Sequence, residues 1–254
     1  MDYGFVRGSD WSKKDNDGKL VTSVDKFRAY LIIIDKKSRY IWIYLTKTKT
    51  PPLDQVQGLL SIFEKFTLAT IMTDQGGELA RSNKFKLLCQ RNNYILQPTG
   101  AYASKQNGMA EKPNKDLAQI MRCLLYSAGL DSKFWSYALR HAVYLKNRWP
   151  HASLQWHTPY ELMFKTKPDL SHLRIFGALV NTKSNAKRCM KLDTITSQGI
   201  FMTYSGTNKN VYVVNEDGTN ERLSTHLTYD EAHMSSHKQD LPPIAITLQQ
   251  RGYY

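Results

Sequence analysis

The sequence has no long hydrophobic run and few cysteines. None of its apolar stretches reaches the roughly 18 consecutive residues of a membrane span. Residues 1–10 lack the basic start and apolar block of a signal peptide. The three cysteines, Cys89, Cys123 and Cys189, form no CxxC pair, which argues against a disulfide framework and a structural zinc site. We therefore expect an intracellular protein with no membrane partner, whose cysteines fill space in the core.

Acidic residues are also scarce, at 22 against 35 lysines and arginines, and the formal net charge is +13. Such a charge favours a polyanionic partner, with nucleic acid first and an anionic membrane surface second. A basic protein that is merely soluble is the alternative that charge alone leaves open.

The order of patterned segments predicts a mixed sheet with helices on both faces, followed by a small all-β unit. Two apolar runs separated by Asp35–Ser38 predict a hairpin. Apolar residues at helical spacing and turn signals predict the elements after it. These are a helix over 53–63, a strand at Thr70–Thr73, a helix over 79–92, a strand at Tyr94–Leu96, a helix from Asn107-Gly108 to Gly129, a helix capped by Asp131, and short strands over 175–230.

Three acids stand where polar residues are least expected. Asp2 opens the predicted first strand, Asp74 ends the strand Thr70–Thr73, and Glu111 lies near the start of the long helix. The 36 residues between Asp74 and Glu111 can return the chain to the same end of the sheet. Carboxylates that converge in this way suit two divalent cations such as Mg²⁺ or Mn²⁺, which prefer oxygen ligands and assist phosphoryl transfer.

Each acid also has a purely structural interpretation. Asp74 precedes Gln75-Gly76-Gly77 and could form a turn. Glu111 could interact with the helix dipole. Asp2 could be a solvated terminal residue. Spacing alone therefore leaves the metal-site hypothesis open.

The local sequences around these acids resemble copia-type retrotransposon integrases. Ile71–Glu78 resembles their second-aspartate motif, and Pro98 with Ala103–Glu111 resembles their glutamate motif. Further matches occur in order along nearly the whole chain: Leu31–Asp35, Ser38–Tyr40 with Trp42, Phe134-Trp135, Ala142–Arg148, Thr158–Glu161, Pro168-Asp169, His172–Gly177 and Gly199–Tyr204.

The resemblance implies a ribonuclease H-like fold with a mixed five-stranded sheet, followed by a small β-barrel. It implies metal-dependent DNA cleavage and strand transfer, with Asp2, Asp74 and Glu111 as catalytic residues that bind two Mg²⁺ or Mn²⁺ ions. Asp35, in the hairpin turn, falls on a non-catalytic acid of the family. The expected domains are a catalytic core over 1–165, a connector over 166–182, the barrel over 183–232 and a polar tail over 233–254.

The residues around Glu111 are the expected DNA contacts. We expect Gln106, Asn107 and Gly108 to form a mobile approach to Glu111, and the lysines to meet phosphates. The predicted DNA-binding residues are Lys105, Gln106, Asn107, Lys112 and Lys115. The expected partners are element ends and chromosomal target DNA, with a homo-oligomeric protein located in the nucleus after cytoplasmic transit.

Two features depart from the family pattern. The sequence starts one residue before Asp2, so we expect a trimmed copy without the amino-terminal zinc segment and most of the first strand. Pro113 follows Glu111 by two residues; it costs little if the helix starts near Ala110 and bends the helix if it starts upstream. A catalytically decayed, DNA-binding remnant is therefore the alternative function. A ribonuclease H or resolvase and a purely structural basic protein are further candidates.

Overall fold

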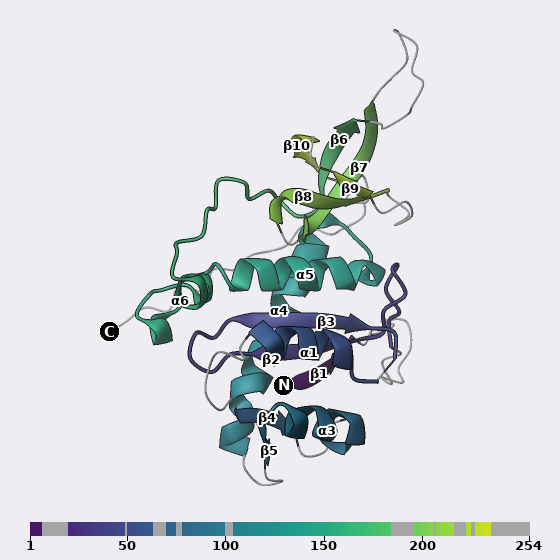
Figure 1. The fold of residues 1–254 in the computed structure, drawn as a ribbon. Coiled ribbons are helices and arrows are strands. Elements are labelled where there is room, and N and C mark those ends of the chain that lie inside the picture. Colours follow the sequence, from purple (N-terminus) through teal and green to yellow (C-terminus); the bar gives the residue numbers. More distant parts are fainter. Residues whose placement is uncertain are drawn as a thin grey trace, which may run out of the picture.

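A computed structural model of the chain describes residues 1–6, 20–48, 50–62, 70–74, 78–99, 104–183, 196–205, 207–215, 222–224 and 227–234. Strands and helices alternate in the amino-terminal part, and a separate sheet forms the carboxy-terminal part (Figure 1). Within these ranges, no helix combines the length and the apolar character needed to cross a membrane.

The first sheet is antiparallel, in the order β1 (Asp2–Phe5), β2 (Ala29–Ile34), β3 (Ile41–Thr46). β2 and β3 form the hairpin that the sequence predicts. In its turn, the carboxylate of Asp35 accepts hydrogen bonds from the backbone N–H of Ser38 at 2.6 Å and from its hydroxyl at 2.7 Å. Asp35 therefore has a local structural role in closing the hairpin.

A parallel pair of strands, β4 (Thr70–Asp74) and β5 (Ile95–Thr99), forms a second sheet. β5 extends beyond the predicted Tyr94–Leu96 and includes Pro98, which the structure accommodates because a strand edge leaves one backbone N–H without a ladder partner. The amino group of Met1 donates to the carbonyl of Met72 at 2.7 Å. This bond joins the two sheets, although the described residues do not show one continuous five-stranded ladder.

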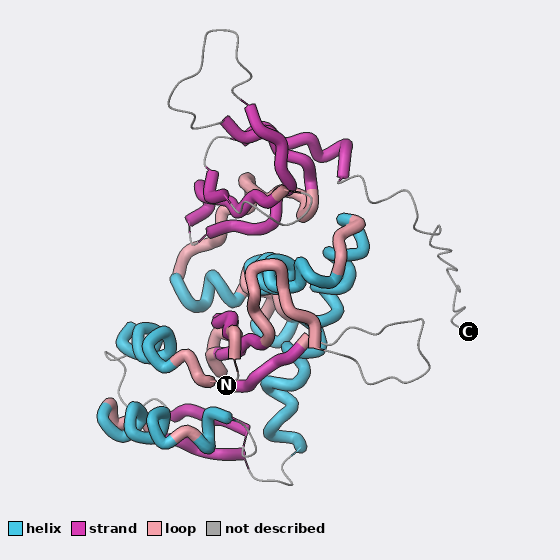
Figure 2. The backbone as a smooth tube through the Cα atoms, turned by 90° about the vertical axis from the view of Figure 1, so that its right-hand side faces the viewer, coloured by secondary structure: helices cyan, strands magenta, loops and turns pink. Residues whose placement is uncertain are grey.

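Helices cover both faces of the first sheet (Figure 2). Side chains alternate along β2: Leu31 and Ile33 pack against one helical layer, and Tyr30 and Ile32 against the other. The first layer contains α1 (Leu53–Ile62) and α3 (Asn83–Arg91), and the second contains α4 (Ser104–Ala128) and α5 (Trp135–Lys146).

Several helix boundaries differ from those predicted. The helix expected over 79–92 is two helices, α2 (Glu78–Arg81) and α3, because the Ser82 hydroxyl accepts from the N–H of Phe85 and caps a new helix. α4 starts at Ser104, ahead of Asn107-Gly108. Gly129 follows α4 with φ +64° as predicted. The Asp131 cap is also confirmed, on the short 3₁₀ helix η1 (Ser132–Phe134) that leads into α5.

The carboxy-terminal sheet is antiparallel in the order β10-β6-β7-β8-β9. It begins at Ala178, inside the segment expected to be a connector. β9 and β10 are its edges in the described residues, so closure into a barrel stays a prediction. The strands are β6 (Ala178–Lys183), β7 (Thr196–Ser205), β8 (Thr207–Val214), β9 (Arg222–Ser224) and β10 (Leu227–Met234).

The cysteines do not all fill space in the core. Cys89 on α3 is buried as expected, and burial raises the pKa of its thiol. Cys123 on α4 is exposed, so the prediction was wrong there. It stands on the side of α4 that faces solvent, whereas Leu117, Met121 and Leu125 form the buried stripe. Cys189 lies outside the described residues.

His141 joins α5 to the carboxy-terminal sheet. Its ring is 1% exposed and packs against Phe176, Phe201 and Tyr204. In the described part of the chain, its Nδ1 atom has no hydrogen-bond partner. Burial lowers the pKa of His141 to about 4, because the charged imidazolium would lose its hydration.

We predict that this histidine makes the fold acid-sensitive. The pKa of His141 is lower in the folded protein than in the unfolded chain, so the unfolded chain binds a proton at higher pH. The contribution to stability is therefore complete above the unfolded pKa. It is lost as the pH falls toward the folded pKa. The loss from pH 7 to 4 is about 3 kcal/mol. Urea denaturation across this range measures it. His141→Phe should flatten the dependence, whereas the half-exposed control His157→Gln should not. Equal slopes for all three proteins would refute the assignment.

Candidate active site

Asp2 and Asp74 belong to two strands that are linked by a hydrogen bond at the start of the chain. The Met1–Met72 hydrogen bond places the start of β1 beside the middle of β4. Asp2 follows Met1 directly, and Asp74 is the last residue of β4. Because hydrogen-bonded strands run about 4.8 Å apart, the backbone brings both acids to the junction of the two sheets.

Glu111 is carried by α4, which a hydrogen bond fixes against the same sheet. The hydroxyl of Tyr30 on β2 donates to Oδ1 of Asn114 at 2.7 Å. Asn114 lies within one helical turn of Glu111. Leu117, the next buried position of α4, is fully buried in the core that also holds Tyr30. The part of α4 that carries Glu111 is therefore held over β1 and β2.

A glycine makes this contact possible. Gly4 on β1 is the register partner of Tyr30 on β2. A Cβ atom at Gly4 would overlap the Tyr30 ring, so only glycine lets that ring lie across β1 toward Asn114. The sequence carries this signal as a glycine two residues after Asp2, but its meaning depends on a partner far along the chain.

The proposed ligand side chains themselves are not among those described. For Asp2, Asp74 and Glu111 the structure gives the secondary-structure position of the backbone alone, and the same holds for the predicted DNA contacts Lys105, Gln106 and Asn107. Among the side chains that are described, no group of three or more His, Cys, Asp or Glu residues could hold a metal ion. The metal site therefore stays a prediction, supported by the placement of its backbone.

The approach to Glu111 is helical. Gln106, Asn107 and Gly108 belong to the first turns of α4, so the helix begins ahead of the predicted start, and the mobility of this approach stays a prediction. A single glycine costs only about 1 kcal/mol in a helix, which the buried stripe further along α4 can offset. Lys112 and Lys115 are exposed, as phosphate contacts must be, and their spacing places them on neighbouring parts of one helix face.

Pro113 lies inside α4, well beyond its first turn. Of the two helix starts that the sequence left open, near Ala110 or further upstream, the structure shows the upstream one. Proline has no N–H to donate to the carbonyl four residues earlier, and its ring crowds that carbonyl, which belongs to Met109. Pro113 therefore interrupts the hydrogen-bond ladder of α4 two residues after Glu111.

A cationic cluster that the sequence did not indicate lies beside this part of α4. Burial and the positive charge of Lys146 lower the pKa of His151; the carboxylate of Asp116 opposes this shift, and Arg39 and Lys112 add to it. Lys146 also pairs with Asp116 of α4 at 3.1 Å. Arg39 belongs to the β2–β3 turn, Lys112 to α4, Lys146 to α5 and His151 to the loop after it. Because these residues are far apart in the sequence, no local motif predicts the cluster.

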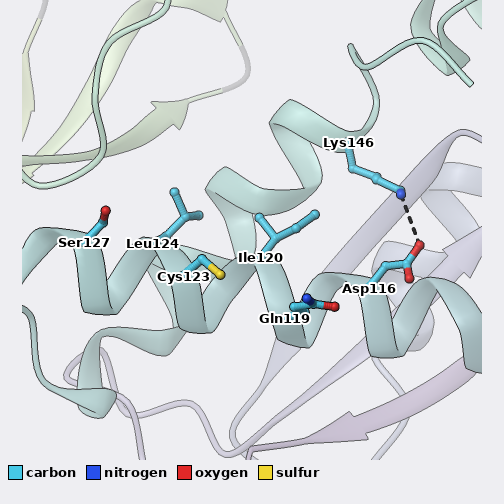
Figure 3. A pocket seen from close by; sticks show the side chains of 7 residues that line it. All are labelled: Asp116, Gln119, Ile120, Cys123, Leu124, Ser127 and Lys146. Atoms are coloured by element: carbon cyan, nitrogen blue, oxygen red, sulfur yellow. Dashed lines mark hydrogen bonds and ion pairs between the residues drawn. The ribbon is translucent and has the colours of Figure 1, made fainter. Parts of the chain in front are cut away.

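The Lys146–Asp116 pair closes one end of an open groove along α4 (Figure 3). The groove has a volume of about 450 Å³. Figure 3 shows Lys146 reaching across from α5 to Asp116. The lining is a mixture of polar and apolar side chains: Asp116, Gln119, Ile120, Cys123, Leu124, Ser127 and Lys146.

Comparison with known proteins gives retrotransposon relatives. The chain is 27% identical over 215 residues to the retrovirus-related Pol polyprotein from transposon RE1 of Arabidopsis thaliana, which covers 83% of this chain. It is 28% identical over 187 residues to the corresponding polyprotein from transposon TNT 1-94 of Nicotiana tabacum, covering 72% of this chain. It spans only 14% of the length of each of these relatives.

The chain is a homologue of copia-type retrotransposon Pol polyproteins. No protein-family model matches it. Among solved structures, the catalytic core domain of BIV integrase aligns with this Pol homologue at a TM-score of 0.40 and 16% identity, covering 65% of this chain and 93% of that one.

One prediction for the Pol homologue concerns the hydrogen bond between Tyr30 and Asn114. Tyr30→Phe should lower the free energy of unfolding by about 1 kcal/mol, because the Asn114 oxygen loses a donor. Chemical denaturation measures this loss, and Tyr126→Phe, at an exposed position of α4, is the matched control. A Tyr30→Phe protein as stable as the unaltered chain would show that the bond does not hold α4.

Another prediction concerns Pro113. Pro113→Ala should restore the hydrogen bond to the Met109 carbonyl and raise the free energy of unfolding, by on the order of 3 kcal/mol at most. Thermal and urea unfolding measure the change. Gln119→Ala, at an exposed position of the same helix, should change stability by no more than about 0.5 kcal/mol. Destabilisation by Pro113→Ala would mean that α4 needs the interruption.

Proposed function

We propose that the chain is the catalytic core of a retrotransposon integrase that cleaves DNA and joins it to another DNA strand. The observation that supports this proposal is the Met1–Met72 hydrogen bond, which lies next to Asp2 in the sequence and two residues before Asp74. Glu111 follows on a helix packed over the same sheet. Homology to retrotransposon Pol polyproteins supports the assignment.

The fold proposed with this function is the ribonuclease H-like one. Pairing of β1 with β4 would join the two sheets into the expected five-stranded mixed sheet. The proposed domains remain a core over 1–165, a connector over 166–182, a small barrel over 183–232 and a tail over 233–254. Strand β6 starts at Ala178, so the carboxy-terminal sheet would extend into the last residues of this connector.

The donor set fits two hard divalent cations. Carboxylate oxygens are the ligands that Mg²⁺ and Mn²⁺ prefer, and Asp2, Asp74 and Glu111 would supply them from two strands and a helix. Such ions, when bound, activate an attacking oxygen and stabilise a leaving one in phosphoryl transfer. The ribonuclease and resolvase alternatives share this chemistry, but Pol homology favours the integrase.

Basic and polar groups of α4 would position the DNA. Lys112 and Lys115 are exposed next to Glu111 and would hold phosphates, which gives affinity without sequence preference. Lys105, Gln106 and Asn107, one and two turns earlier on α4, would contact a DNA end. The proposed partners are element ends and chromosomal DNA. The proposed assembly is a homo-oligomer, and the proposed location is the nucleus.

A DNA-binding remnant without catalysis is the second candidate. Pro113 favours it, because a helix interrupted two residues after Glu111 re-aims the acid that closes the site. The net charge of +13 would preserve DNA binding in either case. The two candidates therefore differ in catalysis and not in affinity.

A strand-transfer and disintegration assay in Mg²⁺ and in Mn²⁺ tests the proposal. Asp74→Asn and Glu111→Gln should each lower product formation by about a hundredfold or more, since even groups that only support a metal ligand contribute up to that much. Asp35→Asn is the matched control, because this acid closes the hairpin turn and can keep its bonds to Ser38 as an amide.

The assay distinguishes the two candidates. Product that disappears in both variants and persists in Asp35→Asn supports the enzyme. An unaltered chain that gives no product with either metal, while it still binds DNA in a salt-sensitive manner, would overturn the enzyme and leave the remnant.

A further inference from the structure

The loop after α5 exposes large aromatic side chains. Trp149 is 67% exposed and Trp156 is 74% exposed. Phe164, at the end of α6 (Pro159–Phe164), is 50% exposed. Single exposed apolar residues are ordinary, but two exposed indoles in one short loop indicate a surface with a binding role.

The loop is held in an uncommon conformation. Gln155 and Trp156 have φ of 53° and 65°, in the left-handed region that bulky residues rarely adopt. Backbone bonds close the loop: the N–H of Trp156 donates to the carbonyl of His151 at 2.9 Å, and the N–H of His151 donates to the carbonyl of His157 at 3.2 Å. Backbone of this kind persists where the surroundings fix it, and it gathers at binding sites.

Both stems of the loop are fixed as well. On one side, the side chain of Asn147 bonds the backbone N–H and C=O of Ile41, each at 2.8 Å. On the other side, Thr158 and Glu161 form a capping box at the start of α6. Trp156 therefore projects from a scaffold whose ends do not move independently.

Cations outnumber acids around the loop, and the nearby acid Asp116 is paired with Lys146 at 3.1 Å. Glu161 is the single acid between Asp131 and Asp169, and it is engaged by the capping box and by His157 at 3.3 Å. Lys165 and Lys167 are exposed on one side of the loop. On the other side, Lys146, Arg39 and Lys112 lie close enough to act on His151.

We propose that residues 149–157 form a binding surface for unpaired nucleotides, with Trp149 and Trp156 stacking on exposed bases and the flanking cations holding phosphates. Aromatic faces combined with cations are the general chemistry of single-strand recognition. A duplex presents its phosphates but keeps its base faces stacked, so the indoles select unpaired segments. This inference rests on the proposed function in taking DNA as the ligand, and it adds which form of DNA the loop recognises.

Binding of fluorescent oligonucleotides to the full chain, measured by anisotropy without divalent metal, tests the surface. The probes are a single strand of thymidines and a blunt duplex of equal length. Trp149→Ala and Trp156→Ala should each weaken single-strand binding by on the order of tenfold and leave duplex binding unchanged. Trp149→Phe and Trp156→Phe should retain most of the affinity. Tyr126→Ala, an exposed aromatic further along α4, is the control.

Salt dependence separates stacking from charge. The tryptophan variants should keep the slope of log Kd against log salt, whereas Arg39→Gln and Lys112→Gln should each reduce it by about one phosphate contact. Photo-crosslinking of a 5-iodouracil strand to the unaltered chain should label Trp149 or Trp156, which tests the contact without any substitution.

Single-strand affinity that the alanine variants leave unchanged, or crosslinks confined to other residues, would overturn the inference and make a protein partner the better occupant of this surface. Failure of strand transfer with intact single-strand binding would overturn the proposed function alone, because the binding assay needs no catalysis.

Discussion

Burial of α5 on all sides is the constraint on which the rest of the molecule depends. Figure 1 shows the helix between the amino-terminal sheet and the carboxy-terminal sheet. A helix of this kind needs apolar or internally satisfied residues around its whole circumference. Its fully buried set includes polar members as well as apolar ones: Trp135, Ser136, Tyr137, Ala138, Leu139, His141, Ala142 and Val143.

The buried polar side chains of α5 are accommodated in different ways. The Ser136 hydroxyl donates to Asp25 at 2.7 Å, and the indole N–H of Trp135 donates to the Val21 carbonyl at 2.9 Å, so both tie residues 21–25 to the helix. His141 is accommodated by staying neutral among aromatic rings. Directly after the helix, Asn147 satisfies the outer backbone of β3 at Ile41.

The position of α4 follows from that of α5, and with it the place of Glu111. Gly177, with φ +83°, lies so close to Ala128 that a side chain there would overlap the end of α4. Tyr30 holds the other half of the helix through Asn114, across the space that Gly4 leaves open. Two glycines far apart in sequence thus set the position of one helix, and the functional proposals inherit their geometry from these contacts.

The loop with Trp149 and Trp156 depends on the same framework. Its entry is fixed where α5 ends, and Tyr160 donates its N–H to the Asn147 carbonyl at 2.8 Å. Lys112 of α4 lies close enough to the loop to act on His151.

The sequence by itself determined the elements whose signals are local. The hairpin with its Asp35 turn, the Gly129 stop and the Asp131 cap follow from short-range hydrogen bonds and backbone preferences, and the structure confirms them. Homology to retrotransposon Pol proteins was likewise readable in the motifs. Asp2, Asp74 and Glu111 could be chosen because acids at strand ends and a helix start are conspicuous, and their chemistry stays a prediction.

Tertiary structure alone decided the features that depend on distant partners. The early start of α4 at Ser104 contradicts the local signals of Gly108 and Pro113, because packing of the Leu117 side of the helix outweighs weak propensities. The sequence alone also did not predict three further features: the helix break at Ser82, the solvent-facing position of Cys123 and the cations around His151. Each results from residues that meet only after the chain has folded, and no spacing within one segment encodes such a meeting.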